Sequence, residues 1–341
     1  MSQLKKLSEK LNVSLLARDL TAYIDYFTGL GFRLDNIYPD DDPKVAIMSG
    51  NNIQIRIDKG IGKEVKLTEL PNSDEVIFPP TEHKFEVRKL QDNDPWIIGR
   101  AGMLYRDLLP DRLGGSIIAS HIRIPVGGPV PDMVHYHTIG FQLIFCYRGW
   151  VKLVYEDQGP AFILNAGDCV TQPPQIRHRV LEASDNLEVI EIGVPADHMT
   201  TIDHDMNLPT SEYLPDREFQ GQKFCHHQVD EAQWNLWKMQ GFEFRDTGIE
   251  IATAGMVSVH VARVLENTKK TQTITHDADI LFTFIMEGEM MLGADDREPI
   301  QLRNGEAFVI PPNFKYQLIN WTEDLELLEV SLPGNYNTQT L

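Results

Sequence analysis

Residues 128–149 read GPVPDMVHYHTIGFQLIFCYRG, and residues 167–182 read GDCVTQPPQIRHRVLE. Successive side chains of a β-strand point to opposite faces, so His135 and His137 share one face and lie about 6.6 Å apart along the strand. Neutral imidazole binds zinc, copper, iron and nickel, and a catalytic metal site keeps a coordination position open. Two histidines on one face therefore indicate a metal site.

Further polar and turn residues follow these histidines at regular intervals. They are, in order, Gln142 after four residues and Gly149 after six more, then Gly167, Pro173 after five residues, and His178. This spacing resembles the two signature motifs of the cupin superfamily, in which a glutamate usually stands at the position of Gln142. Gln175 and Glu182 also depart from the family pattern, which usually has glycine and asparagine there.

The cupin resemblance implies a jelly-roll β-barrel that holds one divalent metal ion. The implied metal ligands are His135, His137, Gln142 and His178, and the histidines would act in catalysis through the metal. If Gln142 does not bind, three histidines hold the ion and leave up to three positions for substrate and oxygen. A neutral amide does not balance the charge of the cation, so we expect an anionic small-molecule substrate.

Three-histidine cupins that resemble this chain include iron dioxygenases that cleave diketones, thiols or dihydroxybenzoates. The resemblance therefore implies a non-haem Fe(II) dioxygenase acting on a small enol, diketone or aromatic acid, with zinc, manganese or nickel as alternative metals. Two other functions stay open. One is an oxygen-independent, metal-dependent isomerase or lyase, and the other is a non-catalytic bicupin that binds a small metabolite.

The barrel pattern occurs twice, at an offset of about 140 residues. Gly149 corresponds to Gly288, and Gly167 corresponds to Gly305. Turn sequences such as EDQGP and RNG separate short strands in both copies, which is typical of a sandwich or barrel. Two cupin-sized copies make a bicupin.

The second copy lacks the ligand set of the first. The motif spacing places the following residues at its four ligand positions: Ile274, His276, Leu281 and Tyr316. A single histidine does not hold a divalent metal ion, so we expect the second barrel to be metal-free.

Residues 12–58 predict a small βαβββ unit. Asp19 is the expected N-cap of a helix whose apolar side chains recur at helical spacing, and two strands meet at Gly50. The phrase DLTAYIDYFTGLGF in this unit resembles one half-module of the vicinal oxygen chelate superfamily, which contains glyoxalases and extradiol dioxygenases. A complete site of that family needs two such modules, so a structural or dimerising role is implied here.

Together these patterns predict a mainly β chain, with two tandem cupin barrels preceded by a small α+β module. The predicted segments are residues 1–60, the module; 61–95, a connector; 96–198, the metal-binding barrel; 199–243, a crossing segment with a helix over 230–240; and 244–341, the second barrel.

The sequence contains other reactive side chains, but their spacing does not indicate a second metal site. Residues 225–227 are Cys-His-His, but neighbouring side chains point apart, and a loop is predicted there. Cys146 is expected to be a small core residue. Arg123, which recurs in the second copy, is expected to form a structural ion pair. Glu182 is an alternative partner for the second nitrogen of His178.

The amino-acid composition limits the kinds of molecule that this chain is expected to bind. In 341 residues, Lys and Arg number 31 against 50 Asp and Glu, so the net charge of -19 argues against nucleic acid and anionic membranes as partners. Three cysteines suggest no disulfide framework, and the first twenty residues lack the apolar core of a signal peptide, so we expect a cytoplasmic protein. A lone half-module with open strand edges favours a homodimer.

Overall fold

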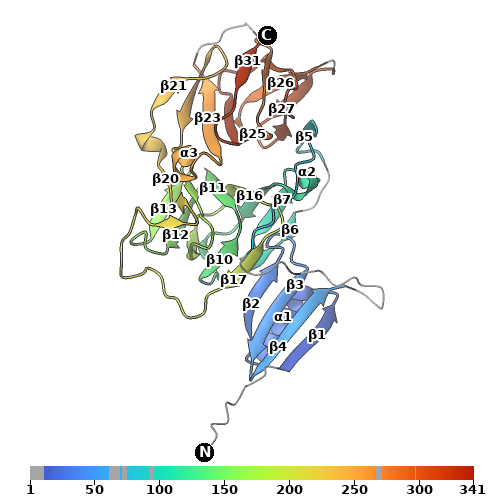
Figure 1. Cartoon of the computed structure of the whole chain (residues 1–341), viewed down its shortest axis with the longest axis vertical. Coiled ribbons are helices and arrows are strands. Elements are labelled where there is room, and N and C mark those ends of the chain that lie inside the picture. The colour runs from blue at the N-terminus through green and yellow to red at the C-terminus, as the bar shows by residue number, and fades with distance from the viewer. Residues whose placement is uncertain (1–10, 61–69, 71–74, 93–95, 266–270, 296) are drawn as a thin grey trace, which may run out of the picture.

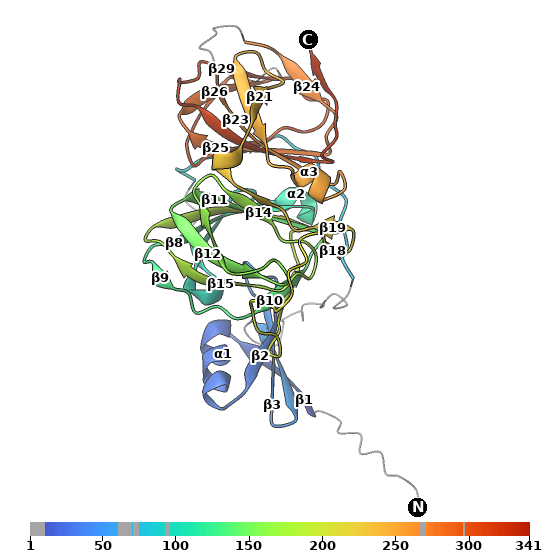
Figure 2. The same ribbon diagram turned by 90° about the vertical axis from the view of Figure 1, so that its left-hand side faces the viewer.

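The computed structural model describes residues 11–60, 70, 75–92, 96–265, 271–295 and 297–341. Its three parts follow one another along the long axis (Figures 1 and 2): the N-terminal module (residues 11–60), barrel 1 (residues 96–202) and barrel 2 (residues 234–340). The predicted fold class, mainly β with two barrels behind a small α+β module, is confirmed. None of the described helices is long and apolar enough to cross a membrane.

The module has the predicted βαβββ order. Its elements are β1 Leu11–Ala17, α1 Leu20–Gly29, β2 Arg33–Tyr38, β3 Val45–Gly50 and β4 Ile53–Lys59. Asp19 caps α1, because its carboxylate accepts a hydrogen bond from the backbone N–H of Ala22 at 3.0 Å. The apolar face of α1 packs on the sheet, where Leu20, Met48 and Ile57 are buried.

Barrel 1 consists of two facing sheets. Its elements are β6 Ile97–Ile98, η1 Arg100–Gly102, β7 Leu104–Asp107, α2 Arg112–Gly115, β8 Ile118–Ile124, β9 Gly128–Pro129, β10 His135–Thr138, β11 Phe141–Arg148, β12 Trp150–Tyr155, β13 Phe162–Asn165, β14 Cys169–Thr171, β15 His178–Ala183, β16 Leu187–Val194 and β17 Met199–Ile202. The motif glycines end strands in tight turns: Gly149 has φ +77°, and a Cβ there would meet the Ser184 hydroxyl at 2.3 Å.

The module and barrel 1 share one sheet, whose strand order is β1-β4-β3-β2-β17-β10-β15-β12-β13. β2 pairs with β17, and β17 pairs with β10, so three neighbouring strands join the two parts (Figure 1). The register places Ile37 beside Thr200, and Thr200 beside His137. The module therefore reaches the strand that carries the predicted metal ligands.

The segment between the barrels differs from the prediction. It contains β18 Glu218–Phe219, β19 Gln222–Lys223, β20 His226–His227 and the short 3-10 helix η2 Val229–Glu231. The predicted helix over 230–240 is wrong: β21 Trp234–Leu236 pairs with the next strand, and the Arg263 guanidinium lies 3.6 Å from the centre of the Trp234 ring. The loop predicted at 225–227 is also wrong, because β20 pairs with β14.

Barrel 2 repeats barrel 1. Its elements are β21, β22 Phe242–Asp246, α3 Ile249–Ala252, β23 Ser258–Val264, β24 Ile274–His276, β25 Ile280–Glu287, β26 Glu289–Ala294, β27 Ile300–Arg303, β28 Ala307–Val309, β29 Tyr316–Ile319, β30 Glu326–Leu332 and β31 Thr338–Thr340. An additional strand, β5 Glu86–Arg88, reaches it from the region predicted as a connector and pairs with β28. One apolar core joins the facing sheets of the two barrels; it contains Phe145 and Ile192 of barrel 1 and Phe284 and Val330 of barrel 2.

Candidate metal centre

The three motif histidines meet inside barrel 1. His135 and His137 lie on β10, and His178 begins β15, directly opposite His135 in the strand pairing. Ring centroids are 4.2 Å apart for His135 and His178, 5.1 Å for His135 and His137, and 5.2 Å for His137 and His178. All three are buried, and one ligand atom from each lies within 4.8 Å of the others. The cluster predicted from spacing is therefore present.

Hydrogen bonds at the Nδ1 atoms determine which nitrogens face the centre. The Nδ1 of His135 lies 2.7 Å from the carbonyl of Met133, and that of His178 lies 3.0 Å from the carbonyl of Ile176. A carbonyl only accepts, so each Nδ1 carries the proton and each Nε2 keeps its lone pair. The alternative partner of His178 suggested by the sequence, Glu182, does not take this role.

His137 is oriented by a longer chain of hydrogen bonds. Its Nδ1 lies 2.9 Å from the hydroxyl oxygen of Thr200, and that hydroxyl donates its single proton to the carboxylate of Asp40. Thr200 therefore accepts from Nδ1–H, which leaves Nε2 as the donor atom of His137. Three neutral imidazoles, each with its second nitrogen held by a neighbour, form the donor set expected of a transition-metal site.

Gln142 lies beside the histidines with a fixed amide. Its Nε2 donates to the carboxylate of Glu191, which only accepts when ionised, so the amide oxygen must point the other way. That oxygen is buried and has no hydrogen-bond partner among the described residues. Gln142 lines the same cavity as His137 and His178, so its oxygen is available as a further donor.

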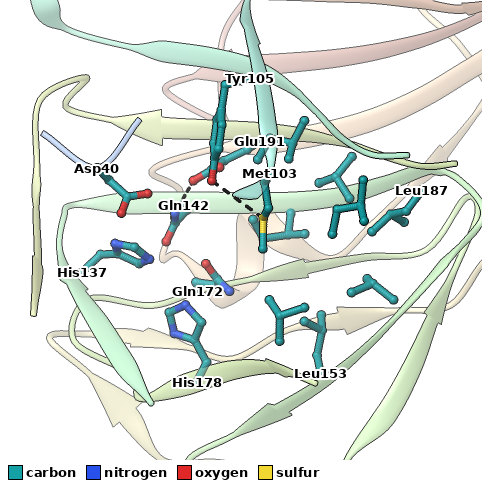
Figure 3. A pocket seen from close by; sticks show the side chains of 16 residues that line it. Asp40, Met103, Tyr105, His137, Gln142, Leu153, Gln172, His178, Leu187 and Glu191 are labelled. Carbon is teal, nitrogen blue, oxygen red and sulfur yellow. Dashed lines mark hydrogen bonds between the residues drawn. The ribbon is translucent and has the colours of Figure 1, made fainter. Parts of the chain in front are cut away.

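The cavity has an empty volume of about 570 Å³, counting its opening to solvent. Most of its wall is apolar: Met103, Ile122, Ile124, Ile144, Val151, Leu153, Val180, Leu187 and Val189. Its polar members gather at one end around His137 and His178 (Figure 3), and include Gln142, Gln172 and Glu191. The described residues that line it include no lysine or arginine.

Asp40 is one of the site residues that the sequence did not reveal. It lies in the loop between β2 and β3 of the module, is 3% exposed, and lines the cavity beside His137 (Figure 3). In the sequence, Asp40 is only the first residue of an acidic run at residues 40–42. Two carboxylates, Asp40 and Glu191, therefore line the cavity near the histidines.

The other reactive residues lie outside this centre. His226 and His227 are half-buried on β20, and burial lowers the pKa of both. Cys146 is a fully buried core residue whose pKa is raised to about 12 by burial. Arg123 forms the predicted structural ion pair, at 2.6 Å from Glu188.

Barrel 2 keeps the geometry of the motif with other side chains. Ile274 pairs with Tyr316 as His135 pairs with His178. Burial, with the nearby Lys238 ammonium, lowers the pKa of His276 to about 4. The described residues contain two groups of three potential ligands, and neither lies in barrel 2. That this barrel carries no metal stays a prediction.

Comparison with known proteins identifies the fold. No family model matches the sequence, and no curated protein matches it. Among solved structures, salicylate 1,2-dioxygenase from Pseudaminobacter salicylatoxidans is 14% identical, with a TM-score of 0.55 over 78% of this chain and 90% of that chain. Oxalate decarboxylase from Bacillus subtilis is 11% identical, with a TM-score of 0.55 over 82% and 87%. A formate complex of Lactobacillus farciminis oxalate decarboxylase is 14% identical, with a TM-score of 0.52 over 80% and 91%.

These similarities show that the chain has the two-barrel cupin fold over about four-fifths of its length. At such low identity they show the fold alone. The resemblance of the module to the vicinal oxygen chelate superfamily finds no support in any of the comparisons.

Proposed function

We propose that this chain is a metal-dependent cupin enzyme, a non-haem iron dioxygenase that acts on a small enol, diketone or aromatic acid. The observation that carries the proposal is the buried group of His135, His137 and His178, each with its Nδ1 hydrogen-bonded and one ligand atom within 4.8 Å of the others. A ferrous ion bound there would polarise substrate oxygens and allow dioxygen to react with the substrate, which would supply the electrons.

The cavity wall supports a substrate with an apolar body. Aliphatic side chains from five strands, together with Met103, surround the space beyond the histidines, so an aromatic ring or short carbon chain fits there and excludes water. No basic side chain among the described lining residues would pair with a carboxylate, so an acidic group of the substrate would be directed toward the cation.

Glu191 is the residue that we assign to proton transfer. Its carboxylate lines the cavity and accepts a hydrogen bond from Gln142, whose amide therefore stays in place. An enol or phenol bound between the histidines and Glu191 would lose its proton to a carboxylate oxygen of Glu191 and stay bound as the anion.

Gln172 and Tyr155 support the opposite wall. The amide of Gln172 donates to the Tyr155 hydroxyl at 2.9 Å, and the Tyr155 ring stacks on His178 with centroids 5.6 Å apart. Burial raises the pKa of Tyr155, so its hydroxyl stays protonated and continues to position Gln172.

A second candidate keeps the metal but does not use oxygen. The similarity to two oxalate decarboxylase structures favours a metal-dependent lyase or isomerase. A third candidate is a non-catalytic bicupin that binds a small metabolite in the same cavity.

The test measures oxygen consumption. The protein is loaded with ferrous ion under anaerobic conditions and then mixed with oxygen and one of three candidate substrates: salicylate, a dihydroxybenzoate or a 1,3-diketone. We expect consumption with at least one of these compounds, and loss of at least 100-fold in His137→Ala, because that change removes a ligand. His204→Ala, which alters a histidine bonded to the backbone of Leu34, is the control and should keep full activity. Substrate turnover without oxygen would favour the lyase or isomerase. Ligand binding without any turnover would favour the non-catalytic bicupin.

A further inference from the structure

We propose that Asp40, His137 and His198 form a second position for a divalent cation, at the contact between the module and barrel 1. Each offers one ligand atom, these atoms lie within 4.8 Å of one another, and all three residues are buried. The set draws one residue from the module, one from β10 and one from the turn between β16 and β17. It goes beyond the proposed function, because it adds a carboxylate-containing ligand set to the three-histidine one.

His198 provides independent evidence for a ligand at this place. It is 3% exposed, and its Nδ1 lies 3.1 Å from the carbonyl of Ala196, so Nδ1 carries the proton. Its Nε2 is buried and has no hydrogen-bond partner among the described residues. A buried lone pair without a donor is costly, and a cation beside the Asp40 carboxylate would satisfy it.

An ion-pair clamp holds the two loops of this set together. Arg112 of α2 pairs with Asp41, next to Asp40 in the chain, and its guanidinium lies 3.2 Å from the carboxylate of Asp197, next to His198. The third partner of Arg112 is Asp107, at 3.1 Å. The Arg112 guanidinium therefore holds Asp41 and Asp197 in place, and these residues are adjacent in the chain to the proposed ligands Asp40 and His198.

The donor chemistry suits a divalent transition metal. Two imidazoles and one carboxylate are the ligand set of many non-haem iron sites, and they leave coordination positions open. A neutral imidazole has one lone pair, so His137 serves one cation at a time. The second set and the three-histidine set are therefore alternative positions for a single ion, of which the second carries a balancing negative charge.

The test measures Co(II) affinity without oxygen or substrate, so its outcome does not depend on the proposed dioxygenase activity. A double variant of the full chain, His135→Ala with His178→Ala, removes two of the three histidines of the first set. It leaves the second set, Asp40, His137 and His198, intact. We expect this double variant to bind one Co(II) per chain, and the further change Asp40→Asn or His198→Ala to weaken binding at least tenfold. Asp42→Asn, in the same loop and paired with exposed Lys59, is the matched control and should leave the affinity unchanged.

The single variant His178→Gln provides a second series if the double variant does not fold, as judged by circular dichroism and thermal unfolding. Co(II) binding to His178→Gln should likewise fall at least tenfold with Asp40→Asn and stay constant with Asp42→Asn. No Co(II) binding by either series, or binding that is unaffected by Asp40 and His198, would overturn the proposal. Two Co(II) ions per wild-type chain would contradict the sharing of His137.

Discussion

The pair of Gln142 and Glu191 links the wall of the cavity to the metal centre. Both side chains are buried, and the carboxylate fixes the direction in which the amide oxygen points. In barrel 2 the corresponding residues are Leu281 and Glu329, so the carboxylate recurs where the amide does not. The amide is thus a feature of barrel 1 that the repeated fold does not require.

Glu191→Gln tests this role. The new amide can donate as well as accept, so it no longer determines the direction of the Gln142 oxygen, and we expect metal affinity to fall about 10- to 100-fold. The unfolding free energy of the metal-free chain should change by only about 1 kcal/mol, because a hydrogen bond can still form. Isothermal titration with Fe(II) or Co(II) gives the affinity, and Glu182→Gln, on β15, is the control. Unchanged affinity in Glu191→Gln would show that the Gln142 oxygen does not contact the ion.

The residues of the centre differ in how far the sequence could predict them. His135, His137, Gln142 and His178 lie on β10, β11 and β15, and the spacing within the two motifs was sufficient to bring them together. Thr200 and His198 meet them because β17 pairs with β10, and Asp40 meets them because β2 of the module pairs with β17. No interval within a motif encodes that pairing, so the second ligand set could not be predicted.

The segment 230–240 is the element where prediction and structure disagree most. The sequence predicted a helix there, but β21 pairs with β22, and the chain then turns to place Lys238 inside barrel 2. The Lys238 ammonium lies 2.6 Å from the Glu329 carboxylate and 2.7 Å from the Tyr336 hydroxyl. Burial lowers the pKa of Lys238, whereas Glu329 acts in the opposite direction. Tertiary pairing therefore overrides helical propensity.

Lys238→Met tests the importance of this buried pair. Removing the cation leaves the Glu329 carboxylate buried without its charged partner, and we expect the unfolding free energy to fall by roughly 3 kcal/mol. The double variant Lys238→Met with Glu329→Gln should recover part of that loss, because no unpaired charge remains. Urea unfolding measures the free energy of unfolding of both variants. Lys223→Met, which alters an exposed pair with Asp216, is the control and should change stability by less than about 1 kcal/mol. A loss below 1 kcal/mol in Lys238→Met would refute the structural role of the pair.

For the whole molecule, the main result is that the sheet of the module continues into one of the two sheets of barrel 1. Repeats, motif spacing and strand alternation were sufficient to predict a βαβββ module and two barrels in their observed order. They could not predict how these parts join, because the strands β2 and β17 are short and their pairing is non-local. The pairing of β5 with β28 of barrel 2 could not be predicted for the same reason, because the two strands are short and far apart in the sequence.

The most direct test of the account is the location of the metal in crystals of the full wild-type chain grown with Fe(II), from anomalous diffraction at the iron edge. The account predicts one ion per chain inside barrel 1, with the Nε2 atoms of His135, His137 and His178 at about 2.0–2.2 Å from it. An ion at neither ligand set of His137, or no ion in barrel 1 at saturating Fe(II), would contradict it and leave only the fold established.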